Sequence, residues 1–119
     1  MARIMVVEDE EELLSLYSEM MEIFGYEIVA AATNGDEALK AYESMSEKPD
    51  LIILDHRMPV RNGLETAVEI LKKDPDQKIV FVSADSTVKK AAMDLGVIDF
   101  LEKPFVLQKL KDSIDAILS

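Results

Sequence analysis

The sequence predicts an α/β domain of three layers, in which a parallel sheet of five strands lies between helices. Two observations support this prediction. Five short runs recur along the 119 residues, and they are near-continuously apolar rather than alternating, as in parallel strands that are buried on both faces. Between these runs, apolar residues repeat with helical spacing. No linker, internal repeat or low-complexity segment interrupts the alternation, so we expect one domain over residues 1–119.

The first expected strand is rich in β-branched residues, and four similar runs follow it. The expected strands are Arg3–Val7, Ile28–Ala31, Leu51–Leu54, Ile79–Val82 and Val97–Leu101. The expected helices follow in turn and are marked by apolar residues from Leu13 to Phe24, Ala38 to Met45, Leu64 to Leu71, Val88 to Leu95 and Leu107 to Ile117.

Turn residues support the same boundaries. Gly25 and Gly96 stand where a helix would end in a left-handed cap, and an apolar strand follows each of them within a few residues. Pro49 and Pro75 precede the third and fourth strands, where a helix cannot continue. Asn34 stands before the second helix and is expected to cap it.

The composition excludes several classes of function. The absence of cysteine removes disulfides and thiolate chemistry, and the single histidine, His56, removes any multi-histidine metal site. The net charge of −11 argues against nucleic acid as a direct partner, because DNA binding needs clustered cations. No apolar run approaches the roughly 18 residues that span a bilayer, and no signal peptide opens the chain. We therefore expect a cytoplasmic protein with no membrane partner.

Carboxylates collect where the expected strands end, which is the edge at which open parallel α/β sheets bind ligands. Glu8 and Asp9 follow the first strand, Asp55 the third, Ser83 the fourth and Lys103 the fifth. Each residue alone has an ordinary explanation, such as a helix cap or a solvated lysine. Three clustered acids, however, repel one another unless a cation joins them. Oxygen ligands without His or Cys select Mg²⁺, so the sequence predicts a Mg²⁺ site.

Such a site has the parts that phosphoryl transfer needs. A metal held by Glu8 and Asp9, together with the Lys103 ammonium, would neutralise the phosphoryl oxygens. Asp55 sits centrally and is the best nucleophile for in-line attack. No G-x-x-x-x-G-K-[ST] array is present, which argues against a nucleotide-binding ATPase.

The ordered set of strand-end motifs resembles the receiver domain of two-component response regulators. The motifs are Glu8-Asp9, Asp55-x-x-Met58-Pro59-x-x-Asn62-Gly63, Ser83-Ala84 and Lys103-Pro104-Phe105. The resemblance covers the chain from Ile4 to the last helix. It implies a flavodoxin-like, doubly wound (βα)5 fold with strand order 2-1-3-4-5. It also implies that a partner histidine kinase or phosphotransfer protein phosphorylates an aspartate, with Mg²⁺ or Mn²⁺ as cofactor.

The resemblance carries roles onto matching residues. Asp55 would be the phospho-acceptor, Ser83 would hydrogen-bond one phosphoryl oxygen, and Lys103 would pair with another. The implied metal ligands are Glu8, Asp9, Asp55 and the backbone carbonyl of Arg57. The bond before Pro104 resembles the cis X-Pro bond of the family.

A switch is also implied. Phe100 matches the family's switch aromatic and would turn inward when Ser83 moves toward the phosphoryl group. Phosphorylation would shift the fourth helix, fifth strand and fifth helix, which would form the output face for a downstream protein or domain. The residues expected on this face are Lys89, Lys90, Phe100, Lys109 and Lys111. We expect slow self-dephosphorylation, and either a monomer or a weak dimer that depends on phosphorylation.

Several positions depart from the common pattern of the family. Glu8 replaces an aspartate, which lengthens one metal-ligand arm, and Ser83 replaces the commoner threonine. Arg57 and Asp85 occupy variable positions beside the path of an attacking water. Our hypothesis is that they pair across the mouth of the site and slow hydrolysis of the phospho-aspartate. His56 is expected to point away from the crevice, toward the surface.

Two alternatives belong to other classes. An aspartyl-phosphate hydrolase would need a second acid two residues beyond Asp55, where this chain has Arg57. A receiver-like interaction module would work without phosphorylation, and a flavodoxin-like protein would bind FMN. The complete set of acids, hydroxyl and lysine argues against the interaction module. The lack of tryptophan and of a Ser/Thr-rich phosphate loop argues against FMN.

Overall fold

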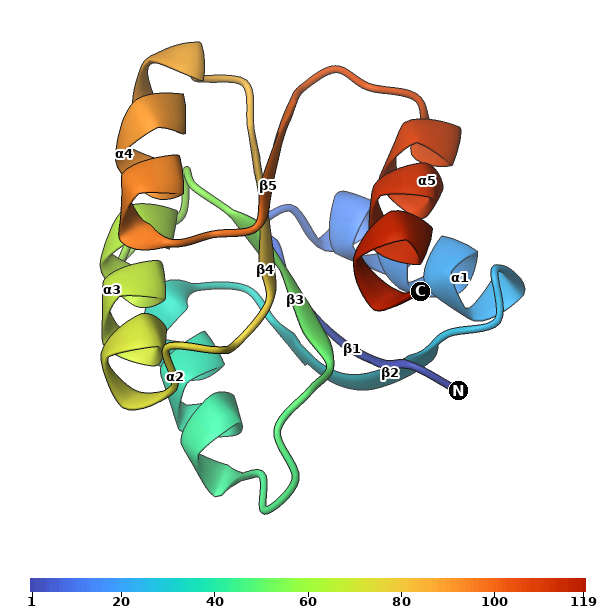
Figure 1. Cartoon of the computed structure of the whole chain (residues 1–119), viewed down its shortest axis with the longest axis horizontal. Coiled ribbons are helices and arrows are strands. Elements are labelled where there is room, and N and C mark those ends of the chain that lie inside the picture. The colour runs from blue at the N-terminus through green and yellow to red at the C-terminus, as the bar shows by residue number, and fades with distance from the viewer.

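The computed structural model describes residues 1–119 and contains one sheet of five parallel strands in the order β2-β1-β3-β4-β5. Helices α1 and α5 cover one face of this sheet, and α2, α3 and α4 cover the other (Figure 1). The three-layer architecture and the strand order are therefore confirmed. The strands are β1 (Arg3–Val7), β2 (Glu27–Ala32), β3 (Leu51–Asp55), β4 (Ile79–Ser83) and β5 (Asp99–Glu102). The helices are α1 (Glu11–Ile23), α2 (Gly35–Ser44), α3 (Gly63–Lys73), α4 (Lys89–Leu95) and α5 (Leu107–Leu118), with a 3-10 turn, η1 (Ser86–Val88), before α4.

The sheet is rigid because its inner strands are buried on both faces. Every residue of β3 and β4 is buried, as their near-continuous apolar runs predict. On one side Phe81 and Tyr42 belong to the core beneath α2, α3 and α4. On the other, Met21 and Leu110 belong to the core beneath α1 and α5. The strand ends are thus fixed from both sides by close packing.

The register brings the carboxyl ends of the strands to one edge. Val7 of β1 pairs with Leu54 of β3, so the residues that follow them, Glu8 and Asp55, leave the sheet side by side. Ser83 is the last residue of β4 and ends at the same edge. The site therefore follows directly from parallel pairing.

The predicted helix caps are present. Gly25 and Gly96 adopt left-handed conformations, with φ of +95° and +111°, and follow α1 and α4. The side chain of Asn34 accepts a hydrogen bond of 2.9 Å from the amide of Glu37 and caps α2.

The region from Asp85 to β5 differs from the expected boundaries. The fourth helix opens with the 3-10 turn, and its regular part starts only at Lys89. The fifth strand begins at Asp99 and not at Val97, because Val97 still completes the turn of α4. Its amide donates to the carbonyl of Ala92 at 3.3 Å. No helix of the structure combines the length and the apolar character that crossing a bilayer requires.

Candidate functional site: an acid cluster with one lysine

Three carboxylates from two strand ends meet at the edge of the sheet. One oxygen each from Glu8, Asp9 and Asp55 lies within 4.8 Å of the other two. Glu8 and Asp55 are buried, with exposed fractions of 1% and 4%, whereas Asp9 is more exposed. Glu8 and Asp55 are neighbours because β1 and β3 pair in register, and Asp9 is the next residue along the chain.

Lys103 is the cation that faces this cluster. Its Nζ lies 3.4 Å from Oε1 of Glu8 and 3.5 Å from Oδ1 of Asp55. The backbone holds the lysine in place, since its amide donates to the carbonyl of Ser83 at 2.8 Å. The peptide bond between Lys103 and Pro104 is cis. Three ionised carboxylates and a single ammonium would give the cluster an excess of negative charge.

The pKa of Glu8 is strongly raised in this cluster. Burial is the main cause that raises the pKa of Glu8 from 4.5 to about 8, the adjacent Asp55 adds to it, and Lys103 opposes it. Oε2 of Glu8 is buried without a hydrogen-bond partner. An orphaned carboxylate oxygen beside two more carboxylates is the donor set that a hard divalent cation requires. The residues present therefore fit a Mg²⁺ ion.

Ser83 and Asp85 form the wall of the site on the β4 side. Ser83 is buried, and its Oγ accepts a hydrogen bond of 3.0 Å from the amide of Asp85. Asp85 accepts from the amide of Thr87 and so begins the turn η1. The Asp85 pKa is lowered chiefly by its bonds from Thr87 and to a smaller extent by Arg57.

Arg57 and Asp85 lie as the ion-pair hypothesis requires. An Nη atom of Arg57 is 4.0 Å from Oδ2 of Asp85, and the arginine side chain is 74% exposed. The contact is long and solvated, so it positions the two side chains without contributing much to folding. It joins the loop after β3 to the loop after β4 on either side of Asp55.

The backbone of the loop after β3 is hydrogen-bonded close to Asp55. The amide of His56 donates to Oδ1 of Asp55 at 2.9 Å, and the amide of Gly63 donates to the carbonyl of His56 at 2.8 Å. A Cβ on Gly63 would stand 2.4 Å from the carbonyl oxygen of Asp55. Only glycine therefore allows α3 to start against the backbone of Asp55. The motif contained this glycine, but only the structure supplies the reason for it.

The expected surface position of His56 is wrong. His56 is half-buried, and its ring lies 5.7 Å from the ring of Phe81, on the side of the sheet under α3 and α4. Its Nδ1 is buried without a partner. The side chain turns inward because the aromatic ring of Phe81 offers it an apolar surface.

Phe100 lies inside the protein and is 8% exposed. Its ring stacks on Phe81 with a centroid distance of 5.8 Å and an angle of 17°. The two residues meet because they are register partners in β4 and β5. Phe100 is therefore buried in this structure, and its inward turn on phosphorylation stays a prediction.

Three of the four lysines expected on the output face are exposed, and the fourth turns elsewhere. Lys89 and Lys90 are exposed on α4, and Lys90 pairs with Asp94 at 2.9 Å. Lys109 is exposed on α5. Lys111 turns toward α1 instead, where its Nζ lies 5.8 Å from the ring centroid of Phe24. The inclusion of Lys111 in that face is therefore wrong, because its ammonium is held between Asp115 of α5 and the ring of Phe24, which follows α1.

An apolar groove, which the sequence reasoning missed, adjoins the acid cluster. It has a volume of about 420 Å³ and shares Lys103 with the cluster. Its apolar walls include Leu13, Leu16, Tyr17, Phe105 and Leu107, from α1 and from the segment after β5. The rings of Tyr17 and Phe105 stack at 6.3 Å. No local signal in the sequence pairs these two segments.

A larger hollow of about 720 Å³ lies at the opposite edge of the sheet and contains none of the predicted site residues. Several of its polar groups bond to one another: Tyr42 donates to Asp74 at 2.6 Å, and Gln77 donates to the carbonyl of Pro49 at 3.0 Å. It therefore offers no group free for chemistry comparable to Oε2 of Glu8.

Comparison with known proteins identifies the family. The family model of the response regulator receiver domain matches residues 4–115. Chemotaxis protein CheY of Thermotoga maritima is 32% identical over 117 residues, which are 97% of this chain and 96% of that protein. The chain belongs to the response regulator receiver domain family, as its motifs indicated.

Solved structures of a relative agree with this assignment. The response regulator TrrA from Thermotoga maritima, crystallised in complex with Mg²⁺ and BeF, is 38% identical, with a TM-score of 0.88 over 98% of this chain and 99% of TrrA. TrrA in complex with the histidine kinase ThkA gives 39% identity and a TM-score of 0.85, with both chains fully covered.

Proposed function

We propose that the chain is a phospho-accepting signalling switch in which Asp55 takes a phosphoryl group in a Mg²⁺-dependent reaction. The observation that carries this proposal is the geometry around Asp55. Its buried carboxylate has two further carboxylates within 4.8 Å and an ammonium at 3.5 Å, at the ligand-binding edge of a receiver fold.

Each side chain has a part in the transfer. Glu8, Asp9, Asp55 and the backbone carbonyl of Arg57 would hold Mg²⁺, which supplies neutralisation of the phosphoryl oxygens when bound. An Asp55 oxygen attacks phosphorus in line, a new P–O bond forms, and the bond from phosphorus to the donor breaks with its electron pair leaving on the donor. Lys103 pairs with one phosphoryl oxygen, and the hydroxyl of Ser83 donates to another. Mn²⁺ offers the same preference for oxygen ligands and is the expected substitute.

The donor that we propose is a histidine kinase or a phosphotransfer protein. TrrA, which is 39% identical, was crystallised with a histidine kinase. In this chain the apolar groove between α1 and the segment after β5 opens beside Lys103 and offers a docking surface next to the acceptor. A chain that receives phosphoryl groups from such a kinase works in the cytoplasm, which is the location we propose.

The signal then leaves through the side of the sheet that holds Phe100. Movement of Ser83 toward a phosphoryl group would shift the loop that Ser83 anchors through the amide of Asp85, and with it η1 and α4. A downstream protein or domain reads this shift. Slow hydrolysis resets the switch, and the Arg57–Asp85 pair limits access of water to the phosphorus.

Incubation with acetyl phosphate tests the proposal. Intact mass should increase by one phosphoryl group in the presence of Mg²⁺ and stay unchanged after chelation with EDTA. Asp55→Asn is the matched control, because it keeps the size of the side chain and removes the nucleophilic carboxylate. Labelling of Asp55→Asn to the same extent as wild type would place the acceptor at another residue. No labelling of wild type would leave an interaction module that works without phosphorylation.

A further inference from the structure

The loop between β3 and α3 holds a strained turn. Val60 has a φ of +69°, a conformation that a β-branched residue rarely adopts. The amide of Arg61 donates to the carbonyl of Pro59 at 2.7 Å, which closes a three-residue γ-turn around Val60. Such a backbone persists only where its surroundings hold it. Val60 itself is 77% exposed, so its own side chain cannot supply that restraint.

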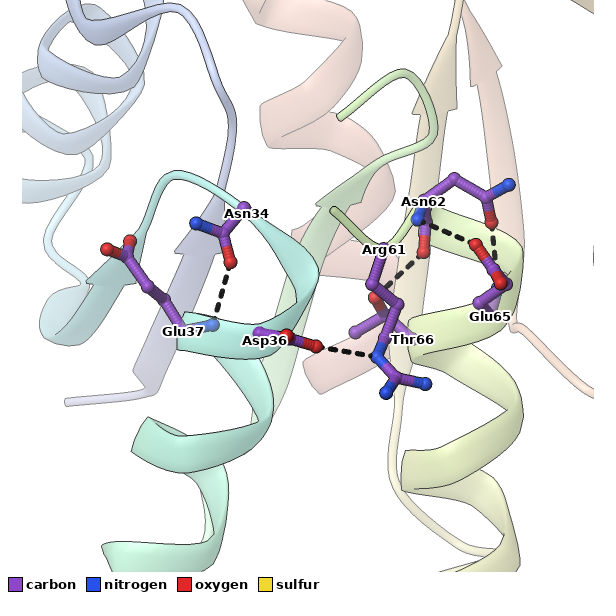
Figure 2. Close-up of polar contacts among 7 residues, drawn as sticks. All are labelled: Asn34, Asp36, Glu37, Arg61, Asn62, Glu65 and Thr66. Atoms are coloured by element: carbon purple, nitrogen blue, oxygen red, sulfur yellow. Dashed lines mark hydrogen bonds and ion pairs between the residues drawn. The ribbon is translucent and has the colours of Figure 1, made fainter. Parts of the chain in front are cut away.

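The end of the loop that leads into α3 is anchored to that helix. Asn62 and Glu65 form a reciprocal cap, with bonds of 2.9 and 3.0 Å between side chain and backbone in both directions (Figure 2). The hydroxyl of Thr66, which is buried, donates to the carbonyl of Asn62 at 2.8 Å. These bonds hold the helix end of the loop and leave the turn at Val60 without support.

The support comes from α2, a different segment of the chain. Nε of Arg61 donates to Oδ1 of Asp36 at 2.9 Å, in the first turn of α2 (Figure 2). Next to Asp36, the backbone of Gly35 packs directly on the loop. A Cβ at Gly35 would stand 2.5 Å from the carbonyl oxygen of Arg61 and 2.3 Å from Oγ1 of Thr66. The start of α2 therefore presses on the residue that leaves the strained turn and also binds its side chain.

The geometry points to a positioning role for this contact. We propose that Asp36 and Arg61, seated on Gly35, form a brace that fixes the β3–α3 loop and thereby the backbone carbonyl of Arg57 for Mg²⁺. The inference rests on the proposed function, because the carbonyl matters only if the site binds the metal. The brace lies outside the acid cluster and touches neither the metal ligands nor the phosphoryl group.

The chain supplies a matched control for this role. Lys73, the last residue of α3, pairs with Glu43 near the end of α2, so a second ion pair joins α2 to α3 far from the β3–α3 loop. Side-chain exposure is similar in the two pairs, at 36% and 48% for Arg61 and Asp36, and 48% and 53% for Lys73 and Glu43. If Mg²⁺ affinity falls only because α2 packs less tightly on α3, the fall should be equal in Arg61→Ala and Lys73→Ala. If Mg²⁺ affinity falls because the β3–α3 loop is no longer fixed, the fall should appear in Arg61→Ala alone.

The test measures two properties of the unphosphorylated full chain. Hydrogen exchange of the amides at positions 57, 58 and 60 to 62, without metal, should be faster in Arg61→Ala than in wild type or Lys73→Ala. Calorimetry should give a Mg²⁺ dissociation constant about tenfold weaker in Arg61→Ala, the lower end of the loss found when groups that orient metal ligands are removed. Midpoints of urea unfolding without metal should differ little between Arg61→Ala and Lys73→Ala. Asp36→Arg combined with Arg61→Asp should restore both exchange and affinity.

The outcomes separate this inference from the proposed function. Equal Mg²⁺ affinity in wild type and Arg61→Ala, or equal losses in Arg61→Ala and Lys73→Ala, overturns the brace and leaves the phospho-acceptor intact. Failure of the charge-reversed double variant to recover overturns it as well. Failure of wild type to bind Mg²⁺ at all overturns the proposed function and the brace together.

Discussion

Mg²⁺ binding by the unphosphorylated protein should depend on pH through Glu8. Burial, aided by the neighbouring Asp55, raises the pKa of Glu8 from 4.5 to about 8 in the metal-free protein. Divalent cations bind the ionised carboxylate, so Mg²⁺ must displace a proton wherever Glu8 is protonated. The perturbation to apply is therefore a change of pH, with Glu8→Gln as the variant that removes the titrating group.

The pKa sets the size of the effect. A carboxyl with a pKa of about 8 is about 90% protonated at pH 7, so each Mg²⁺ bound should release about 0.9 proton. The apparent affinity should rise about tenfold per pH unit below about pH 7 and level off above pH 8.

The same group affects folding. The folded-state pKa of Glu8 lies above its unfolded value, so the folded protein binds more protons between about pH 4.5 and 8. The free energy of unfolding of the metal-free protein should therefore receive its full contribution from Glu8 below this range and lose it as the pH rises to about 8. Mg²⁺ should stabilise the protein more at pH 8 than at pH 6.

Titration calorimetry in two buffers with different ionisation enthalpies measures the protons released. Glu8→Gln should bind Mg²⁺ more weakly, release almost no proton and lose the pH dependence. Without metal it should be more stable than wild type at pH 8, because no buried carboxylate has to ionise. An affinity of wild type that is flat between pH 6 and 8, or full proton release in Glu8→Gln, would refute the reasoning.

Three further predictions concern residues around the acceptor. Arg57→Ala and Asp85→Ala should each shorten the lifetime of the phosphorylated protein a few-fold, because the ion pair at 4.0 Å no longer screens the site from water. The lifetime is measured as the loss of the added mass after the phosphodonor is removed, and unchanged lifetimes in both variants would contradict this prediction. Phe81→Ala should lower the free energy of unfolding by about 3–5 kcal/mol in urea titrations, because a fully buried ring that stacks on Phe100 and lies beside His56 is lost; a loss below about 1 kcal/mol would show that the core can collapse around the gap. Gly63→Ala should destabilise by on the order of 1–3 kcal/mol and slow phosphorylation by acetyl phosphate, since its Cβ would meet the Asp55 carbonyl oxygen; wild-type stability and rate would contradict the close approach.

The fold could be predicted because parallel strands buried on both faces leave a local pattern. Each apolar run of the sequence overlaps a strand. The acids that follow β1 and the acid that ends β3 meet because paired parallel strands end at one edge. The start of β5 could not be read from the apolar residues, because Val97 is apolar whether it caps α4 or extends the strand. The hydrogen bond from the amide of Val97 to the carbonyl of Ala92 places Val97 with the end of α4.

The parts of the site that sequence reasoning missed depend on contacts between distant segments. His56 turns inward because Phe81 lies beside it, and Lys111 leaves the expected output face because Phe24, which follows α1, lies within its reach. The contact between Arg61 and Asp36 joins residues that are 25 positions apart. Side-chain direction at such positions is set by tertiary neighbours, which no local periodicity encodes.

The central claim is that the carboxylate of Asp55 becomes an acyl phosphate, and chemical trapping tests it most directly. Borohydride reduces an aspartyl phosphate to homoserine with loss of phosphate, so peptide mapping by mass spectrometry after treatment with acetyl phosphate identifies the acceptor. We predict homoserine at position 55 in the presence of Mg²⁺ and aspartate there after chelation. Homoserine at position 9, the reduced form of glutamate at position 8, or unreduced Asp55 in protein that carries the phosphoryl mass would contradict the account.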